Sequence, residues 1–375
     1  MLRHQRELDT SLELDRADPR LHDVLRLGAY QLRWLTRVPS HAAVSTSVEL
    51  ARDTVGEAST GYVNRSLRRL SANGYRLSGN SQTHPDWLVD RWKSRFGPDE
   101  TARLIEWNDK TPELFLQPAR WNQERLLAQL RDAGVNADEA PFGAGIRFYP
   151  IANSRYPIAK DLPGYTEGAF IVQDPAHALI ARFAGIQPGE QVYDACAAPG
   201  GKAVALEAAG ARVLAGDARH ERLGRLADTT RRAGVAIRCI AANLEAAPLR
   251  PASVAAVFVD APCTATGTMR RHPDARWRLR SSVFARAAAR QRELLGAAAP
   301  LVRPGGLLIY ATCSLEPEEN EQVVEQFLKA HLEFTRSPGG QTVPAELLTP
   351  AGDFQSLPQR HCIDGAYAAR LVRGR

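Results

Sequence analysis

Residues 191–217, QVYDACAAPGGKAVALEAAGARVLAGD, decide the fold of the C-terminal half of this chain. The segment reads as a strand, a turn with two glycines, a helix and a second strand that ends in Asp217. Gly200 and Gly201 let the backbone turn sharply and approach a ligand closely. The free N–H groups at the start of the helix suit a carboxylate, and an acid at the end of the second strand suits ribose hydroxyls. The pattern predicts a nucleotide-binding βαβ unit that lacks the GxGxxG spacing.

The rest of the chain divides around this unit. From about residue 170, apolar runs such as AIRCIAAN, VAAVFVDAP and GGLLIYATC alternate with helical segments, which predicts a parallel sheet with helices on both faces. LFLQPARWN, ERLLAQLRDAG and GIRFYP indicate a small α+β unit, preceded by the short helical patterns WLVDRWKSRFG and TARLIEWND. We therefore predict an all-helical segment at 1–78, linker helices and the small α+β unit at 79–169, and an α/β domain at 170–375.

Composition limits the function classes. The chain of 375 residues has a formal net charge of +6 and a sequence pI of about 9.2, which fits an anionic partner such as RNA. A bias toward Arg, with only 5 Lys among 48 basic residues, explains the global charge equally well, so local clusters carry more weight. No apolar run reaches the roughly 18 residues of a membrane span, and the charged N-terminus is unlike a secretory signal. We expect a cytoplasmic protein.

Two of the five cysteines end neighbouring strands. Cys263 follows VAAVFVD after the turn AP, and Cys313 ends LLIYAT. In a sheet of this type both strands end at the same edge, where ligands bind, so both thiols should face one pocket with Asp260 beside them. Thiolates are nucleophiles, but the spacing alone leaves open which thiol attacks. The cysteines form no CxxC pair and no zinc-type cluster, so we expect no metal.

Three long stretches resemble a known family. DACAAPGGK (194–202), VDAPCTATGTMRRHPDARW (259–277) and YATCSLEPEENE (310–321) are similar to the first, fourth and sixth motifs of the RNA cytosine-5 methyltransferases. The helical stretch from LRLGAYQLRWL to YVNRSLRRL is similar to the latter part of a NusB-like domain, and HCIDGAYAARL resembles the family's closing strand. The resemblance spans nearly the whole chain and is closest to the bacterial 16S rRNA methyltransferases of the RsmB type. A NusB-like domain needs more helices than residues 1–76 provide, so we expect an incomplete bundle.

This resemblance implies a class I, Rossmann-like methyltransferase domain with S-adenosylmethionine as cofactor. It implies that the cofactor contacts lie in the glycine turn and at the ends of the following strands: Cys196, Ala197, Ala198, Pro199, Gly200, Gly201, Lys202, Asp217, Asn243 and Asp260. Asn243 departs from the family, which usually has Asp at this position; an amide oxygen still accepts a hydrogen bond from the adenine amino group.

The resemblance also assigns chemical roles. Carbon 5 of cytosine is a poor nucleophile until a thiolate adds to carbon 6. The family pattern implies that Cys313 attacks and that Cys263 acts in product release. It further implies that Asp260 holds the cytosine and that Lys202 orients Asp260.

RNA contacts are expected near the fourth motif. Arg270, Arg271 and His272 follow Cys263 closely, and Arg binds phosphates bidentately and stacks on bases. A solvated surface is the alternative for these side chains. The target base must leave any helix to reach the thiol, so we expect base flipping or a single-stranded loop.

Alternatives remain open at this point. The same chemistry on tRNA or 23S rRNA fits the motifs, and a catalytically silent RNA-binding or assembly factor is a hypothesis from another class. A DNA cytosine methyltransferase fits less well, because its attacking Cys belongs to the fourth motif, whereas here a TC cysteine is present too. We expect a monomer that acts on 16S rRNA; the sequence does not say which cytidine is modified, or whether the substrate is naked RNA or an assembling subunit.

Overall fold

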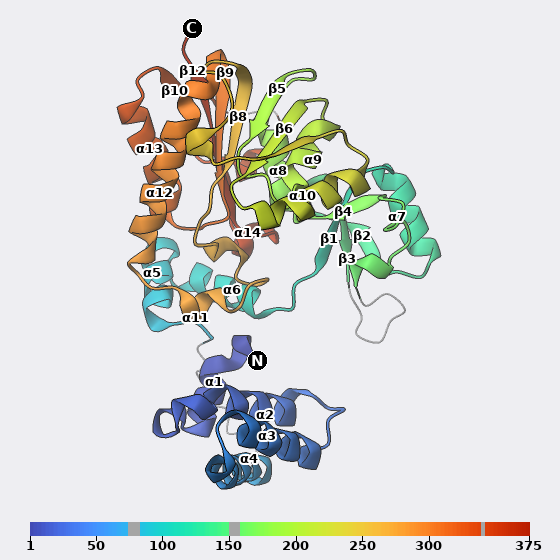
Figure 1. The fold of residues 1–375 in the computed structure, drawn as a ribbon, viewed down its shortest axis with the longest axis vertical. Coiled ribbons are helices and arrows are strands. Elements are labelled where there is room, and N and C mark those ends of the chain that lie inside the picture. Colours follow the sequence, from blue (N-terminus) through green and yellow to red (C-terminus); the bar gives the residue numbers. More distant parts are fainter. Residues whose placement is uncertain (74–82, 150–157, 339–341) are drawn as a thin grey trace. The chain divides into compact units, whose positions relative to one another are not determined.

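The computed structural model describes residues 1–73, 83–149, 158–338 and 342–375. It forms two compact units (Figure 1), which are Met1–Asp109 with His272–Arg278, and Lys110–Arg271 with Leu279–Arg375. The predicted boundary at 78/79 lies outside the described residues. The predicted boundary at 169/170 falls inside the second unit and stays a prediction. Among the described residues, no helix combines the length and the hydropathy needed to cross a membrane.

The helical unit begins with four helices, as the apolar spacing predicted. They are α1 (Gln5–Leu12), α2 (His22–Trp34), α3 (Ser40–Thr54) and α4 (Thr60–Asn73). Their buried faces form one apolar core that includes Leu25, Val44 and Leu67. At Gly28, α2 packs closely against α3 and α4, since a Cβ there would lie 2.6 Å from Leu67 Cδ1 and 2.6 Å from Ser47 Oγ.

Three more helices belong to this unit: α5 (Asp86–Phe96), α6 (Pro98–Asp109) and the short α11 (Ala275–Arg278). Arg276 of α11 is fully buried, and its guanidinium donates to the Asp109 carboxylate at 2.8 Å and to the Asn108 carbonyl at 3.0 Å. Trp277 Nε1 donates to the Leu2 carbonyl at 2.8 Å. These bonds explain why a segment inside the fourth motif belongs to the helical unit.

The second unit contains the small sheet that was predicted as an α+β unit. Its strands are β1 (Leu114–Pro118), β2 (Ala137–Glu139), β3 (Ile146–Phe148) and β4 (Phe170–Val172), in the antiparallel order β2-β3-β1-β4. Helix α7 (Gln123–Asp132) buries Leu126 and Leu130 in the same core as Leu116 and Phe148 of the strands. The apolar side chains of one helix therefore hold this sheet together.

The larger sheet has eight strands in the order β10-β12-β9-β8-β5-β6-β7, with β11 paired to β12. The strands are β5 (Gln191–Asp194), β6 (Arg212–Asp217), β7 (Arg238–Ala241), β8 (Val254–Asp260), β9 (Val302–Thr312), β10 (Phe334–Arg336), β11 (Phe354–Ser356) and β12 (Ala366–Arg373). The strands β5 to β9 run parallel, whereas β12 is antiparallel to β9. The parallel strands thus bring their carboxyl ends to one edge.

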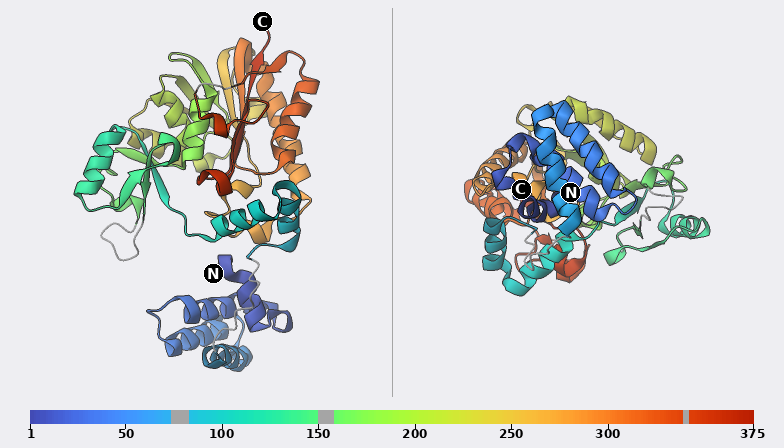
Figure 2. Two further views of the ribbon diagram at one scale, coloured as in Figure 1. Left: turned by 180° about the vertical axis from the view of Figure 1, so that it is seen from behind. Right: turned by 90° about the horizontal axis from the view of Figure 1, so that it is seen from below.

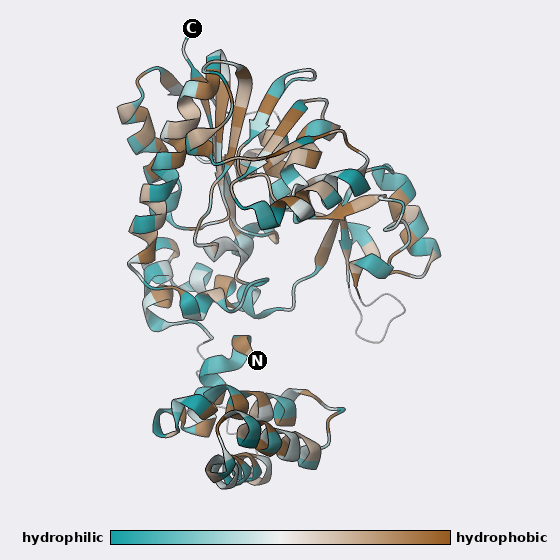
Figure 3. Cartoon of the chain, viewed as in Figure 1, coloured by the Kyte–Doolittle hydropathy of each residue, from teal (hydrophilic) through white to brown (hydrophobic). Residues whose placement is uncertain are grey.

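Helices cover both faces of this sheet (Figures 1 and 2). They are α8 (Pro175–Ala184), α9 (Gly201–Ala208), α10 (His220–Ala233), α12 (Val283–Ala298), α13 (Glu321–Ala330) and the short α14 (Pro358–His361). Along β8, Ala256 and Phe258 pack in the core with α8 to α10, whereas Val257 and Val259 pack with α12 and α13. This alternation makes the strands apolar on both faces (Figure 3) and confirms the predicted three-layer α/β domain.

Replacing Gly28 by Val should destabilise the helical unit by about 1–3 kcal/mol, because the added atoms would collide with the buried Leu67 and Ser47 side chains. Gly61→Val is the matched control, since a Cβ at Gly61 meets nothing within 4 Å. Hydrogen exchange of α2 to α4 amides measures the effect. Equal exchange in both variants would contradict this description of the packing.

Candidate active site

The carboxyl edge of the large sheet encloses a cavity of about 270 Å³. Its walls come from the ends of β5 to β9 and from the helices α8, α10 and α12. The lining residues are His177, Ala195, Cys196, Ala198, Asp217, Ala218, Arg219, Arg222, Asn243, Leu244, Asp260, Ala261, Pro262, Cys263, Arg290, Leu294 and Cys313. Seven of the predicted site residues therefore meet in one place: Cys196, Ala198, Asp217, Asn243, Asp260, Cys263 and Cys313.

The two thiols lie side by side in this cavity. Asp260 pairs with Ala311 across the parallel strands β8 and β9, so the loops that follow both strands start at the same level. Cys263 Sγ lies 3.1 Å from Cys313 Sγ, and the backbone N–H of Cys313 donates to Cys263 Sγ at 3.3 Å. The hydrogen bond to Cys313 and burial raise the pKa of Cys263 well above its usual range, so Cys263 holds its proton at neutral pH.

Glu319, which the sequence analysis did not single out, ties the two cysteine loops together. Its buried carboxylate accepts from the backbone N–H of Thr264 at 2.9 Å, from the Thr264 hydroxyl, and from Ser314 Oγ at 2.6 Å. Gln291 Nε2 of α12 donates to it at 3.0 Å. Burial raises the pKa of Glu319, while these donors favour its ionised form. Thr264 follows Cys263 and Ser314 follows Cys313, so this one carboxylate positions both thiols.

Lys202 reaches the cavity through Asp260. Its buried ammonium, on the first turn of α9, lies 2.6 Å from Asp260 Oδ2, which is the contact expected from the motifs. Burial, followed by repulsion from Asp260, raises the pKa of the neighbouring Asp194 to about 7. Asp194 is thus partly protonated at neutral pH, and Asp260 is the carboxylate that Lys202 holds at the cavity wall.

The other end of the cavity offers polar groups to a nucleotide. The Asp217 carboxylate, at the end of β6, accepts from the backbone N–H groups of Arg219 at 2.9 Å and Ala198 at 3.3 Å, and Arg222 lies 3.4 Å from it. Asn243 follows β7 with its side chain exposed to the cavity. These groups suit the ribose and base of a nucleotide cofactor.

The remaining predicted cofactor residues shape the turn rather than the cavity wall. Ala197, Pro199, Gly200 and Gly201 are not among the side chains that line the cavity. Gly200 has φ +107°, and a Cβ there would lie 2.8 Å from Leu226 Cδ1. Glycine is therefore required for the turn to pack against α10 and to direct the start of α9 toward the cavity.

His177 is a cavity residue that the sequence analysis missed. It lies on α8, outside the recognised motifs, so only the packing of α8 onto the sheet reveals it. Its Nδ1 is buried and has no hydrogen-bond partner among the described residues. Burial lowers the pKa of His177 well below its usual value, so the imidazole is neutral. His177 therefore adds a neutral imidazole to the cavity wall.

The RNA contacts expected of Arg270 and Arg271 stay a prediction, and in this structure both guanidinium groups pair with acids of the protein. Arg270 is 1% exposed and forms an ion pair with Glu113. Arg271 lies 2.6 Å from a carboxylate oxygen of Asp174 and 2.6 Å from one of Asp364, and both acids are buried. Each arginine therefore compensates the charge of one or two acids of the fold. His272 belongs to the helical unit, and its role in RNA binding stays a prediction.

Arg271→Met should destabilise the protein by about 3–5 kcal/mol near pH 8, because it leaves two buried carboxylates without a cation. Burial, then repulsion from Asp174, raises the pKa of Asp364 to about 7. The native state therefore binds more protons than the unfolded state between roughly pH 4 and pH 7, and stability falls as pH rises through this window. The variant lacks the arginine that lowers the pKa of Asp364. Its loss of unfolding free energy relative to wild type should therefore be smaller at pH 5 than at pH 8.

Urea unfolding of wild type and variant at pH 5 and pH 8 measures this difference. Arg303→Met is the control, since Arg303 forms an exposed pair with Glu190 at 3.3 Å. A deficit of equal size at both pH values would show that buried charge is not its cause.

Comparison with known proteins identifies the parts of the chain. The family model described as 16S rRNA methyltransferase RsmB/F matches residues 183–372. The NusB family model matches residues 1–72, and the RsmF/B-like ferredoxin-like domain matches residues 84–149. These matches agree with the helical, α+β and α/β parts of the structure.

Relatives align along most of the chain. The probable ribosomal RNA small subunit methyltransferase B of Synechocystis sp. is 32% identical and covers 100% of this chain and 89% of its own. The ribosomal RNA small subunit methyltransferase B of Erwinia tasmaniensis is 35% identical over 94% of this chain and 82% of its own. The crystal structure of PH0851 superposes with a TM-score of 0.83 at 26% identity, covering 99% of this chain and 88% of that one.

NSun6 from Pyrococcus horikoshii, at 18% identity and a TM-score of 0.67 over 78% of this chain and 98% of that one, shares the fold. The family match, the relatives and the cavity with its glycine turn lead to one conclusion. This chain belongs to the RsmB/F family of 16S rRNA methyltransferases, which depend on S-adenosylmethionine.

Proposed function

We propose that this protein methylates carbon 5 of a cytidine in 16S rRNA through a covalent bond between Cys313 and carbon 6 of the base. The observation that carries the proposal is the pair of thiols, 3.1 Å apart, in the cavity that also contains Asp260. Two cysteines placed together beside a carboxylate suit a reaction that must both form and break a thiol adduct.

The chemistry explains why a thiol is needed. Addition of a thiolate to carbon 6 makes carbon 5 electron-rich and able to attack a methyl group. S-adenosylmethionine supplies this methyl group as a sulfonium. Afterwards a base removes the proton from carbon 5, the double bond between carbons 5 and 6 re-forms, and the electrons of the carbon–sulfur bond return to Cys313 as a thiolate.

The two thiols take different roles because their surroundings differ. The hydrogen bond to Cys313 and burial raise the pKa of Cys263, which disfavours Cys263 as the attacking thiolate, and the family motif assigns the attack to Cys313. Its S–H group can instead donate to the Cys313 sulfur and support the thiolate there. Cys263 then acts in product release, close to the sulfur that must leave.

Asp260 and Lys202 orient the base. A carboxylate at the cavity wall accepts a hydrogen bond from the exocyclic amine of cytosine, or binds N3 when the base is protonated there. The Lys202 ammonium, 2.6 Å from Asp260, holds this carboxylate in place. Asp260 would act on the base before and during adduct formation, and Lys202 would act through Asp260.

The other end of the cavity is the place we assign to S-adenosylmethionine. Asp217 would bind the ribose hydroxyls, and Asn243 would accept a hydrogen bond from the adenine amino group. The N-terminal N–H groups of α9, which begins at Gly201, would bind the carboxylate of the methionine moiety. The choice of 16S rRNA rests on the relatives' names, so tRNA and 23S rRNA are alternative outcomes of the test. A monomeric, cytoplasmic and metal-free enzyme stays a prediction.

Wild-type protein should transfer labelled methyl from S-adenosylmethionine to deproteinised 16S rRNA, with the label in 5-methylcytidine after nucleoside analysis. Cys313→Ala should abolish transfer, because no thiolate is left to add to carbon 6. Cys263→Ala should slow release and accumulate a denaturation-resistant protein–RNA adduct. Cys239→Ala, in β7 and away from the cavity, is the control. Label in another nucleoside, or full activity of Cys313→Ala, would overturn the proposed reaction.

Glu319→Gln should lower kcat by about tenfold or more while the KM for S-adenosylmethionine stays near the wild-type value. The amide places an NH₂ group where the carboxylate accepts from four donors. Losing one of these hydrogen bonds costs about 1–3 kcal/mol. A tenfold loss in rate corresponds to about 1.4 kcal/mol. Glu325→Gln, an exposed residue of α13, is the control. Unchanged kcat in Glu319→Gln would show that this carboxylate does not position the thiols.

A further inference from the structure

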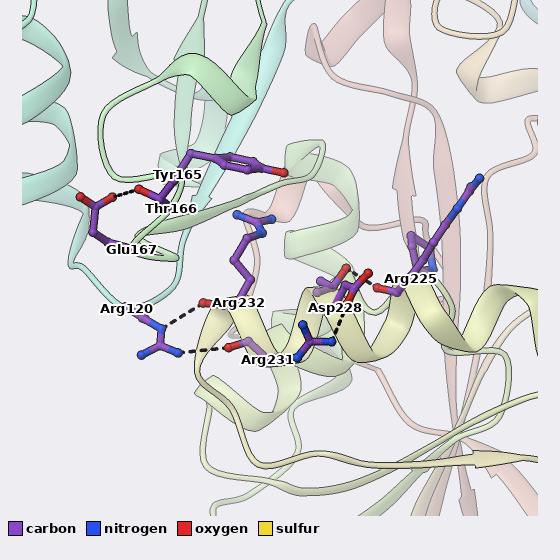
Figure 4. Close-up of a pocket in the computed structure, with 10 residues that line it drawn as sticks. Arg120, Tyr165, Thr166, Glu167, Arg225, Asp228, Arg231 and Arg232 are labelled. Atoms are coloured by element: carbon purple, nitrogen blue, oxygen red, sulfur yellow. Dashed lines mark hydrogen bonds and ion pairs between the residues drawn. The ribbon is translucent and has the colours of Figure 1, made fainter.

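A second, larger hollow of about 830 Å³ lies between the small sheet and α10 (Figure 4). Four arginines line it, together with Tyr165: Arg120, Arg225, Arg231 and Arg232. We propose that this arginine groove binds the phosphate backbone of the substrate RNA next to the target cytidine. The inference rests on the proposed function, which makes RNA the substrate, and adds a binding surface for it.

Arg120 fixes one wall of the groove. Its Nε donates to the Arg232 carbonyl at 2.9 Å and its Nη2 to the Arg231 carbonyl at 3.0 Å, so it caps the C-terminal end of α10. The segment before β4 approaches α10 closely here, since a Cβ at Gly168 would lie 1.7 Å from the Arg232 carbonyl oxygen. The second Nη of Arg120 has no hydrogen-bond partner among the residues that the structure describes.

Arg232 is held at the centre of the groove. Its guanidinium stacks over the Tyr165 ring at 4.4 Å, and its Nη1 donates to the Phe170 carbonyl at 2.7 Å. Figure 4 shows the Arg232 side chain extended toward Tyr165. A guanidinium has five N–H donors, so these contacts orient the group without using all of them. The groove therefore holds two arginines whose positions are set before any ligand binds.

Arg225 supplies a cation that no acid of the described residues neutralises, and Arg231 supplies one that is held only by an exposed ion pair. Both are exposed, and the Arg225 guanidinium has no hydrogen-bond or ion-pair partner in the described ranges. Arg231 pairs with Asp228 at 2.6 Å, but these side chains are 76% and 70% exposed, so this pair contributes little stability. Four guanidinium groups face two carboxylates, those of Asp228 and Glu167, and the Glu167 carboxylate accepts from the Thr166 hydroxyl.

Phosphate is the ligand that this chemistry fits best. Arginine forks bind phosphate oxygens with two parallel hydrogen bonds, and an unneutralised cluster attracts a polyanion. The groove also adjoins the candidate active site, because the turn between β5 and α9 contributes Ala198 to the catalytic cavity and Pro199 to the groove. When a cytidine of the RNA enters the cavity, the phosphates next to it in the strand would therefore lie near the arginine groove.

The test compares Arg225→Gln/Arg231→Gln with Arg250→Gln/Arg286→Gln, a control that removes the same charge. Arg250 precedes β8 and Arg286 lies on α12, and both are exposed and do not line the groove. Deproteinised 16S rRNA is the probe, and its Kd is measured between about 50 and 200 mM salt. We expect the groove variant to raise the Kd about tenfold and to flatten the log–log salt dependence by about 1.4, the value for two contacts to single-stranded RNA.

The control should keep nearly the wild-type salt dependence, and both variants should bind S-adenosylmethionine normally and keep kcat at saturating RNA. An unchanged Kd in the groove variant, or an equal loss in the control, would overturn the proposal. If the groove variant lost binding of inorganic polyphosphate but bound RNA normally, the proposal would also be overturned. The groove would then be an anion site that RNA does not use.

Failure of this inference is distinguishable from failure of the proposed function. If wild-type protein forms 5-methylcytidine and the groove variant binds RNA normally, the function stands and the groove assignment is wrong. If the groove variant loses RNA binding but wild-type protein forms no 5-methylcytidine, the groove stands and the proposed reaction is wrong.

Discussion

The parallel pairing of β8 with β9 is the constraint on which the site depends. Its register places Asp260 opposite Ala311, and the loops that follow therefore bring Cys263 and Cys313 to 3.1 Å. Glu319 fixes both loops through Thr264 and Ser314, so the distance between the sulfur atoms is set by a buried carboxylate as well as by the strands. A slip of one residue in this pairing would direct one thiol away from the cavity.

Ion pairs hold the elements that surround the two thiols. Lys202 compensates Asp260 at the cavity wall, and Arg271 compensates Asp174 and Asp364 beneath the fourth motif. Asp174 and Asp364 are buried, and the half-buried Arg271 offsets the cost of burying their charges. The cations also keep the loop of the fourth motif in place, so the same ion pairs that stabilise the fold hold the chemical groups at fixed positions.

The sequence predicted the order of elements and the convergence of the thiols, because a strand, a glycine turn and a helix are encoded locally and parallel strands end at one edge. It could not predict that Arg270 and Arg271 pair with acids of the protein, since a run of basic residues looks the same whether it meets solvent or such acids. Nor could the sequence predict that His177 lines the cavity or that four arginines line one groove. Arg120 and Arg231 are 111 residues apart in the chain, and only the packing of the small sheet onto α10 brings them together.

The most direct test of the central claim is to identify the sulfur that bonds to the base. RNA in which cytidine is replaced by 5-fluorocytidine should trap the adduct, because fluorine at carbon 5 cannot leave as a proton does. After digestion of the trapped complex, mass spectrometry of the peptides locates the modified cysteine. The account predicts the nucleotide on Cys313, in the peptide that contains TCSLEPEENE; a nucleotide on Cys263 would contradict it.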